Sequence, residues 1–252
     1  MPYAFRTRFK KEIVAEFLPP RRTTKHQRVI IICDGAPGMP SSKFGMLDFF
    51  SKKGFWTFYP RYRGTWESDG TFLQKSLELD ILDVIDQMPR GFVSLWDNKK
   101  YRVKPDEIFI VATSFGGPAG ILASRDPRVK KVVAVSPVVD WRAPSKAEPI
   151  DERGYKLMKA TFGNGYRFSL NHWKKLASGK FYNPVAHAAE IDGSKLFIFH
   201  AQDDESVRAR EVVKFARTTG ARLKLFKTGG HLSSGRIVPK YWPQIAKFFR
   251  AS

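Results

Sequence analysis

Six short runs of apolar residues recur along the chain, and few polar residues interrupt them. They span residues 29–33, 55–59, 108–112, 131–135, 196–200 and 222–226. Such runs are typical of strands that are buried on both faces, as in a parallel sheet. Apolar residues at helical spacing occupy 71–88 and 207–219, between the runs, and 236–249, after the last one. Because strands alternate with helices, the pattern predicts an α/β fold with a doubly wound, mostly parallel sheet.

Two segments depart from this alternation. Residues 4–18 are expected to form two short antiparallel strands at the N-terminal edge of the sheet. Residues 141–190 are too long for a plain connection and contain eight aromatic side chains. We interpret them as a small, mostly helical cap or lid inserted into a single domain that spans 1–252. The alternative is an ordinary surface excursion whose aromatic side chains pack on the core.

The strongest candidate for chemistry is Ser114, which directly follows a predicted strand over residues 108–113 and precedes a predicted helix over 118–124. A strand, a sharp turn at serine and a helix form a nucleophile elbow, which lifts the hydroxyl above the sheet. Bulky side chains two residues before or after the serine would clash at such a turn, and Ala112 and Gly116 are both small. The alternative is a glycine-rich turn with a structural serine, and the strand-to-helix context argues against it.

A nucleophilic serine needs a histidine as general base and an acid that orients the histidine. His231 lies in a loop with two glycines after the last strand, so it can approach a site closely. Acids follow the strand at 196–200, on the edge where open α/β sheets place their sites: Asp203, Asp204 and Glu205. The other histidines are expected to be exposed, or to have packing or supporting roles: His26, His172, His187 and His200.

The order serine, acid, histidine along the chain is that of an α/β-hydrolase. The chain resembles this superfamily over nearly its whole length, and most closely the small hydrolases related to the prolyl oligopeptidase and dienelactone hydrolase groups. Similar proteins carry Gly-x-x-Asp-x-x-Val at the acid, and residues 201–207 match this pattern with Ala201 in the first position. The resemblance therefore selects Asp204 as the acid, with Asp140 in reserve. Ser114 stands where dienelactone hydrolases carry cysteine, so their reaction is not implied.

Acyl transfer also needs two backbone N–H groups aimed at the developing oxyanion. One is expected from Phe115, the residue after the nucleophile. Residues 33–38 resemble the family's His-Gly-x-Pro-Gly loop, which places the second donor at Ala36. Asp34 replaces the usual histidine, and we expect its carboxylate to turn away from the oxyanion and bond the loop backbone. Residues 60–70 are similar to the family's Arg-Gly-x-Gly-x-Ser-x-Gly loop, whose role is architectural.

The resemblance implies a serine hydrolase of the carboxylesterase type, with a triad of Ser114, Asp204 and His231. Its substrates would be esters of small to medium acyl chains, cleaved through an acyl-enzyme on Ser114. One alternative is a peptidase or aminopeptidase of the oligopeptidase kind, acting on short peptides or amino-acid derivatives. Another is a non-catalytic binding protein on the same fold, to which Asp34 would point. Four aromatic residues are expected to line the substrate pocket: Trp66, Trp141, Phe162 and Tyr166.

Composition narrows the class of protein. Hydrophobic residues make up 42% and aromatic residues 14% of 252 residues, enough for a large core, which excludes a disordered chain. Lysine and arginine number 44 against 24 acids, a net charge of +20. The basic residues are scattered and form no tail or nucleic-acid motif, so we expect nonspecific binding to polyanions. A nucleic-acid-associated protein is a further alternative, which the net charge alone motivates.

Several classes of site are missing from the sequence. A single cysteine, Cys33, excludes an intramolecular disulfide and a multi-cysteine metal site. No glycine-rich nucleotide-binding motif or metal-ligand cluster is present, so we predict no cofactor and no metal. No apolar run approaches the roughly 20 residues of a membrane span, and residues 1–10 lack an apolar signal region. We therefore expect a cytoplasmic protein with no membrane span, and the sequence leaves its oligomeric state open.

Overall fold

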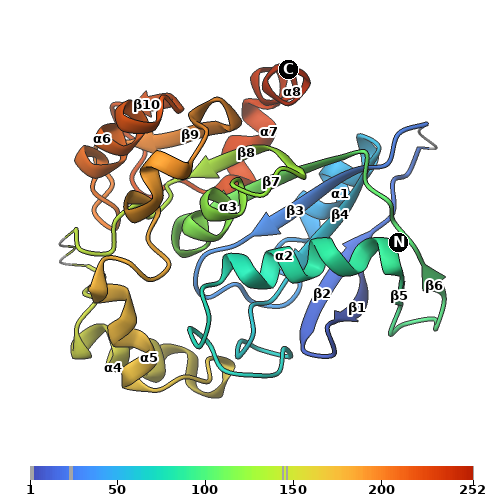
Figure 1. The fold of residues 1–252 in the computed structure, drawn as a ribbon, viewed down its shortest axis with the longest axis horizontal. Coiled ribbons are helices and arrows are strands. Elements are labelled where there is room, and N and C mark those ends of the chain that lie inside the picture. Colours follow the sequence, from blue (N-terminus) through green and yellow to red (C-terminus); the bar gives the residue numbers. More distant parts are fainter. Residues whose placement is uncertain (1–2, 23–24, 144, 146, 252) are drawn as a thin grey trace.

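The computed structural model describes residues 3–22, 25–143, 145 and 147–251 and contains a mostly parallel sheet of eight strands (Figure 1). The spatial order is β1-β2-β4-β3-β7-β8-β9-β10. The six strands from β4 to β10 in this order run parallel, whereas β2 is antiparallel to both β1 and β4. The strands of this sheet are β1 (Phe5–Phe9), β2 (Ile13–Leu18), β3 (Arg28–Cys33), β4 (Phe55–Pro60), β7 (Glu107–Thr113), β8 (Val129–Val135), β9 (Leu196–Ala201) and β10 (Arg222–Phe226).

The predicted fold class is confirmed. All six apolar runs are strands of the parallel part of the sheet, and both N-terminal strands lie at its edge as expected. The central strands β3, β7 and β8 are almost completely buried, because helices cover both faces of the sheet. A separate pair, β5 (Phe92–Val93) and β6 (Lys100–Tyr101), is too short to leave a pattern in the sequence.

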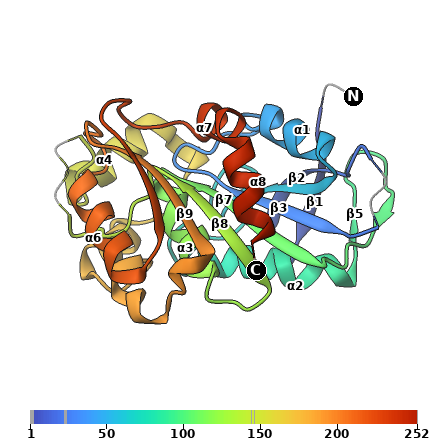
Figure 2. The same ribbon diagram turned by 90° about the horizontal axis from the view of Figure 1, so that it is seen from above.

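Two layers of helices enclose the sheet (Figure 2). Buried side chains of α2, α3 and α6 share one apolar core with one face of the sheet, and those of α1, α7 and α8 share a second core with the other face. The helices are α1 (Phe44–Lys52), α2 (Glu78–Gln87), α3 (Gly117–Ala123), α4 (Glu152–Phe162), α5 (Leu170–Lys174), α6 (Ala209–Thr219), α7 (Ser234–Lys240) and α8 (Trp242–Arg250). No helix of the described residues is long and apolar enough to cross a membrane.

Two predicted helices differ in extent from the observed ones. The segment expected to be helical from residue 71 becomes an α-helix only at Glu78, and the Phe72 amide instead donates to the Arg167 carbonyl at 2.9 Å. The segment 236–249 is divided into α7 and α8 at Tyr241. Pro239 and Pro243 flank this break, and proline has no N–H to donate to a continuous helix.

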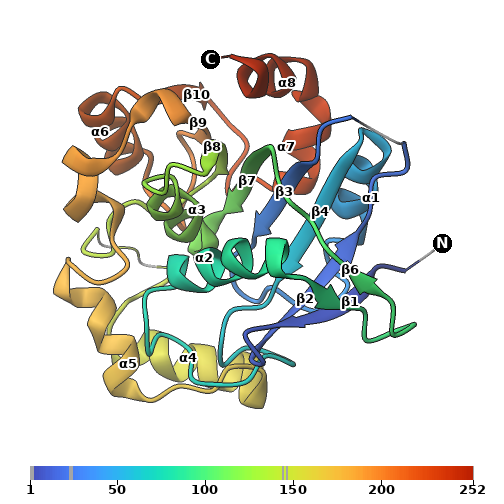
Figure 3. The same ribbon diagram turned by 45° about the vertical axis from the view of Figure 1, so that its right-hand side comes forward.

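Residues 141–190 contain α4, α5 and several 3₁₀ turns, and residues 144 and 146 of this segment lie outside the described residues. Residues 1–2, 23–24 and 252 of the predicted domain also lie outside them. Helices α4 and α5 lie together at the end of the molecule remote from α8 (Figures 1 and 3). The two helices therefore lie away from the layers that cover the two faces of the sheet.

Candidate active site

Ser114 lies at a sharp turn between β7 and α3. Its φ of +51° is in the left-handed region, which side chains other than glycine seldom adopt. The neighbouring loop approaches so closely that a Cβ on Gly35 would lie 2.8 Å from the Ser114 Cβ. A Cβ on Gly116 would lie 2.2 Å from the Asp34 carbonyl oxygen. Only glycine fits at both positions, so the sequence holds the serine in the strained geometry of a nucleophile elbow.

His231 and Asp204 are hydrogen-bonded to each other. His231 Nδ1 lies 2.9 Å from Asp204 Oδ2 and 3.1 Å from Oδ1. The Asp204 side chain is fully buried, and its Oδ1 also accepts from the Ser206 and Val207 amides at 3.0 and 2.9 Å. Because Nδ1 faces the acid, the other ring nitrogen, Nε2, is the one left to exchange a proton with a nucleophile.

The charge of this pair favours a base that accepts a proton. Burial alone would lower the pKa of His231, but the hydrogen bond and the charge of Asp204 outweigh it, and Glu148 adds to them, so the pKa is raised. Burial would raise the pKa of Asp204, but the His231 bond and the Val207 amide outweigh it, so this pKa is lowered. Asp204 is thus ionised at neutral pH and stabilises the imidazolium that forms when His231 takes a proton.

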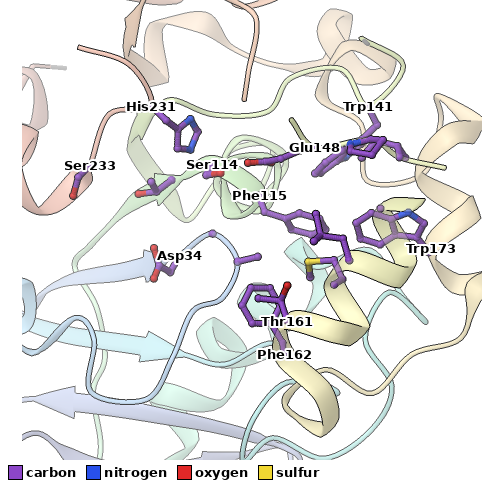
Figure 4. A pocket seen from close by; sticks show the side chains of 18 of the residues that line it. Asp34, Ser114, Phe115, Trp141, Glu148, Thr161, Phe162, Trp173, His231 and Ser233 are labelled. Carbon is purple, nitrogen blue, oxygen red and sulfur yellow. The ribbon is translucent and has the colours of Figure 1, made fainter. Parts of the chain in front are cut away.

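Ser114 and His231 line the same pocket (Figure 4). The hydrogen bonds among the described residues do not include one between the two side chains. In enzymes without bound substrate, such bonds are often long and tighten only in the complex. The structure therefore brings Ser114 and His231 to one pocket and bonds His231 to Asp204.

The loop after β3 lies against the turn at Ser114. Ala36 and Phe115 both line the pocket beside Ser114. Within the described part of the chain, the Ala36 amide donates no hydrogen bond, so it is available to a ligand. The loop is held from outside the pocket, because the Pro37 carbonyl accepts from Trp66 Nε1 at 2.6 Å and from the Tyr166 hydroxyl at 3.0 Å.

These two bonds correct the expected pocket. Trp66 and Tyr166 do not line the cavity that contains Ser114. Tyr166 is buried, and both ring systems lie behind the Pro37 carbonyl. A buried Tyr O–H or Trp N–H needs a hydrogen-bond acceptor, and this carbonyl provides one for both. The two residues therefore hold the loop that carries Ala36.

Asp34 also differs from expectation. Its carboxylate does not bond the loop backbone but pairs with Lys43, at 3.0 Å, and accepts from the Tyr59 hydroxyl at 3.4 Å. Lys43 immediately precedes α1, and both charged side chains are mostly buried. A lysine carries a positive charge and can neutralise a buried carboxylate, whereas the uncharged amides of the loop cannot. The pairing reduces the negative charge that Asp34 would present to an oxyanion.

The pocket is a cavity of about 450 Å³ at the carboxyl ends of the strands. This volume lies in the usual range for small-molecule sites. Trp141 and Phe162 line it, as expected from the sequence. The walls are mostly apolar, and the other apolar side chains in them are Ala36, Phe115, Pro149, Ile150, Leu157, Met158, Trp173 and Leu232.

Neighbouring polar residues have supporting positions. Asp203 accepts from the Gly229 and Gly230 amides at 3.1 and 2.8 Å and so holds the loop before His231. His200 is buried and lies 2.9 Å from the Val207 carbonyl, within the acid-bearing loop. Asp140, the reserve acid, bonds Arg142 and Asn183 instead of His231.

The remaining candidates carry no chemistry here. Cys33 is fully buried, and burial raises the pKa of its thiol, so it is not a nucleophile. The described residues contain no group of three or more metal-ligating side chains. Sequence reasoning missed Glu148, which lines the pocket. A lone glutamate in an irregular loop follows no pattern that would have singled it out.

Comparison with known proteins relates the chain to one family and to several solved structures. The sequence model of the prolyl oligopeptidase family matches residues 41–250. A comparison with curated proteins gives no match. An esterase of Pyrococcus furiosus superposes with a TM-score of 0.68 at 16% identity, over 98% of this chain and 91% of the esterase.

Two further solved structures share the fold. Est1E from Butyrivibrio proteoclasticus, solved with ferulic acid bound, gives a TM-score of 0.68 at 16% identity, over 97% of this chain and 98% of Est1E. An acylaminoacyl peptidase of Pyrococcus horikoshii gives 0.66 at 19% identity, over 99% of this chain. This chain spans only 41% of that peptidase.

Proposed function

The chain belongs to the prolyl oligopeptidase family and is a serine hydrolase, and from this premise we propose that Ser114, His231 and Asp204 form its catalytic triad. We propose further that it cleaves carboxylic esters of small to medium acyl chains through an acyl-enzyme. One observation carries the proposal: a histidine bonded to a buried carboxylate lies in the wall of the pocket that also contains the strained serine.

In the first half of the reaction, Ser114 Oγ attacks the carbonyl carbon of the ester while His231 Nε2 takes the hydroxyl proton. Asp204, bonded to Nδ1, holds the ring in the tautomer whose Nε2 is free to accept. The imidazolium then gives its proton to the leaving alcohol. Water attacks the acyl-enzyme in the second half, and the same histidine acts as base again.

The developing oxyanion is held by the backbone N–H groups of Ala36 and Phe115. Each such donor is worth about 10²–10³ in kcat in serine hydrolases. Trp66 and Tyr166 keep the Ala36 donor in place through the Pro37 carbonyl. The pairing of Asp34 with Lys43 supports this role, because an unpaired carboxylate in the loop would oppose the oxyanion.

The pocket supports a small or medium acyl group as substrate. A cavity of about 450 Å³ with Trp141, Phe162 and other apolar side chains in its walls favours aliphatic or aromatic acyl chains. We assign residues 141–190 the role of a cap, because α4 supplies one wall of the pocket. Aminoacyl and short peptide substrates are the second candidate, and the position of Glu148 favours them.

Labelling by a fluorophosphonate probe tests the proposal, together with hydrolysis of p-nitrophenyl acetate and butyrate. Wild type should be labelled and turn over both esters. Ser114→Ala should lose labelling and lower kcat by at least about 10⁴-fold, because the nucleophile is gone.

Ser194→Ala is the matched control. Ser194 is an exposed serine before β9, at the opposite end of the strands from the pocket, and its variant should behave as wild type. Absence of labelling in a folded wild type would overturn the proposal and favour a binding protein on this fold. Labelling that persists in Ser114→Ala would assign the nucleophile elsewhere.

A further inference from the structure

One carboxylate in the pocket is not itself a member of the proposed triad. Glu148 lies in the loop between β8 and α4, and its side chain points into the pocket toward Ser114 and His231 (Figure 4). The other charged or titratable groups in the lining are Asp34 and His231. No lysine or arginine is among the described residues that line it. Among the described lining residues, the Glu148 carboxylate thus has no lysine or arginine beside it, in a protein whose net charge is +20.

Glu148 differs from the other carboxylates of the site because its side chain has no hydrogen-bond or ion-pair partner within the described part of the chain. Asp34 pairs with Lys43 at 3.0 Å, and Asp204 is bonded to His231. Among the described residues, the Glu148 side chain forms no hydrogen bond or ion pair, and only its amide is engaged, by Ser145 Oγ at 3.0 Å. Glu148 is an exposed residue at the pocket, so solvent hydrates its carboxylate when the pocket is empty.

A purely apolar acyl group in the pocket would displace water from the Glu148 carboxylate. It would offer this carboxylate no hydrogen-bond donor and no positive charge. Desolvating an unpaired charge is costly, whereas a cation brought by the substrate would compensate it. The nitrogen of an α-aminoacyl group is attached to the carbon next to the carbonyl that the serine attacks. A carboxylate that points toward Ser114 is therefore placed to meet that nitrogen rather than the far end of the acyl chain.

Building on the proposed ester-cleaving function, we propose that Glu148 binds the α-ammonium group of the substrate's acyl part. The preferred substrates are then esters or short amides of apolar amino acids with a free amino group. The side chain of the amino acid occupies the apolar walls at Trp141, Met158 and Phe162. Acyl groups that carry a carboxylate next to the carbonyl are repelled from the same position.

Two esters that differ only in the amino group test this assignment. The p-nitrophenyl esters of phenylalanine and of 3-phenylpropionic acid have the same ring and chain length, and only the first carries an ammonium. Both are assayed with the full chain at a pH that keeps the amine protonated. The readout is the ratio of their kcat/KM values, after correction for spontaneous hydrolysis.

In Glu148→Gln, this ratio should fall about tenfold or more relative to wild type, as expected for the loss of a hydrogen bond between charged groups. Comparing ratios cancels the intrinsic reactivity of each ester and any effect of the variant on His231, since both esters use the same base. Glu148→Asp keeps the charge and should recover part of the preference.

Glu152→Gln is the matched control. Glu152 begins α4 only four residues further on, is exposed, pairs with Lys156 at 2.9 Å and does not line the pocket. Its ratio should equal that of wild type. An unchanged ratio in Glu148→Gln, with normal turnover of the neutral ester, would overturn the Glu148 assignment and leave the esterase proposal intact. Absence of fluorophosphonate labelling and of turnover of both esters would overturn both.

Discussion

Asp203 and Asp204 are adjacent in the chain but hold different parts of the same loop. Asp204 faces inward and bonds the His231 ring, whereas Asp203 faces outward and accepts from the Gly229 and Gly230 amides. Those amides lower the pKa of Asp203, so it is ionised at neutral pH as Asp204 is. One carboxylate thus orients the ring, and the other positions the backbone that carries it.

This division predicts unequal losses on substitution. Asp204→Asn should lower kcat by about 10⁴-fold, because an amide at Nδ1 favours the wrong tautomer and no longer stabilises the imidazolium. Asp203→Asn keeps a carbonyl acceptor for the glycine amides and should lower kcat by less than about tenfold. Steady-state kinetics on one p-nitrophenyl ester measures both. Equal losses in two folded variants would show that the assignment of the acid is wrong.

At the scale of single residues, the sequence predicts a functional residue when the neighbouring residues in the chain mark it. Ser114 and His231 stand out because a strand end or paired glycines mark them, and only a family motif separates Asp204 from Asp203. Trp66 and Tyr166, predicted to line the pocket, are not among its lining residues, and both bond the Pro37 carbonyl instead. The position of an aromatic side chain in the fold depends on contacts with residues that are distant in the chain. A local sequence pattern does not contain these contacts.

At the scale of elements, the packing of α3 on β7 depends on one glycine. A Cβ at Gly120 would lie 2.6 Å from the Ala112 Cβ and 3.0 Å from Ile110 Cγ2. Ala112 lies two residues before the nucleophile, at the position where the elbow motif more often has glycine. The extra methyl group at 112 is thus accommodated by the absence of one on the facing helix.

Gly120→Ala should therefore lower the free energy of unfolding by about 1–3 kcal/mol, the usual cost of overpacking. Alanine is otherwise the better helix former, by about 1 kcal/mol. Urea unfolding measures the change. Adding Ala112→Gly should recover part of the loss, because it removes the nearest contact. Gly45→Ala in α1, where a Cβ meets nothing within 4 Å, should be neutral or slightly stabilising. A Gly120→Ala variant as stable as wild type would contradict this account.

The sequence predicts helices and strands well where the burial of their side chains alone determines the pattern of apolar residues. Strands β3, β7 and β8 read as apolar runs because both of their faces are covered. Helix α2 begins later than its pattern because the backbone near Phe72 is bonded to Arg167, a tertiary contact that replaces a helical one. Short elements such as β5 and β6 contain too few residues to show any period.

At the scale of the whole molecule, the net charge of +20 is distributed unevenly with respect to the site. The pocket has no lysine or arginine in its described lining, while a groove at the opposite, amino ends of the strands has several. In that groove, Arg28 lies over the Phe55 ring and Lys53 over Trp242, and Arg22 and Arg250 lie beside them. None of these four cations forms an ion pair with a carboxylate in the described part of the chain.

Clustered, unpaired cations attract polyanions without reading their sequence. We therefore predict that the protein binds single-stranded or duplex nucleic acid and heparin at low salt, without sequence preference, and releases them by about 200 mM salt. Salt dependence is measured as the slope of the logarithm of the binding constant against the logarithm of the salt concentration. In the double variant Arg28→Gln/Lys53→Gln, this slope should decrease by about one for each phosphate that is no longer neutralised. Lys214→Gln/Arg217→Gln removes the same charge from the exposed face of α6. Fluorescence anisotropy across a salt series compares the two pairs. Equal effects would show that binding follows net charge alone, and binding that persists at high salt would contradict the electrostatic origin.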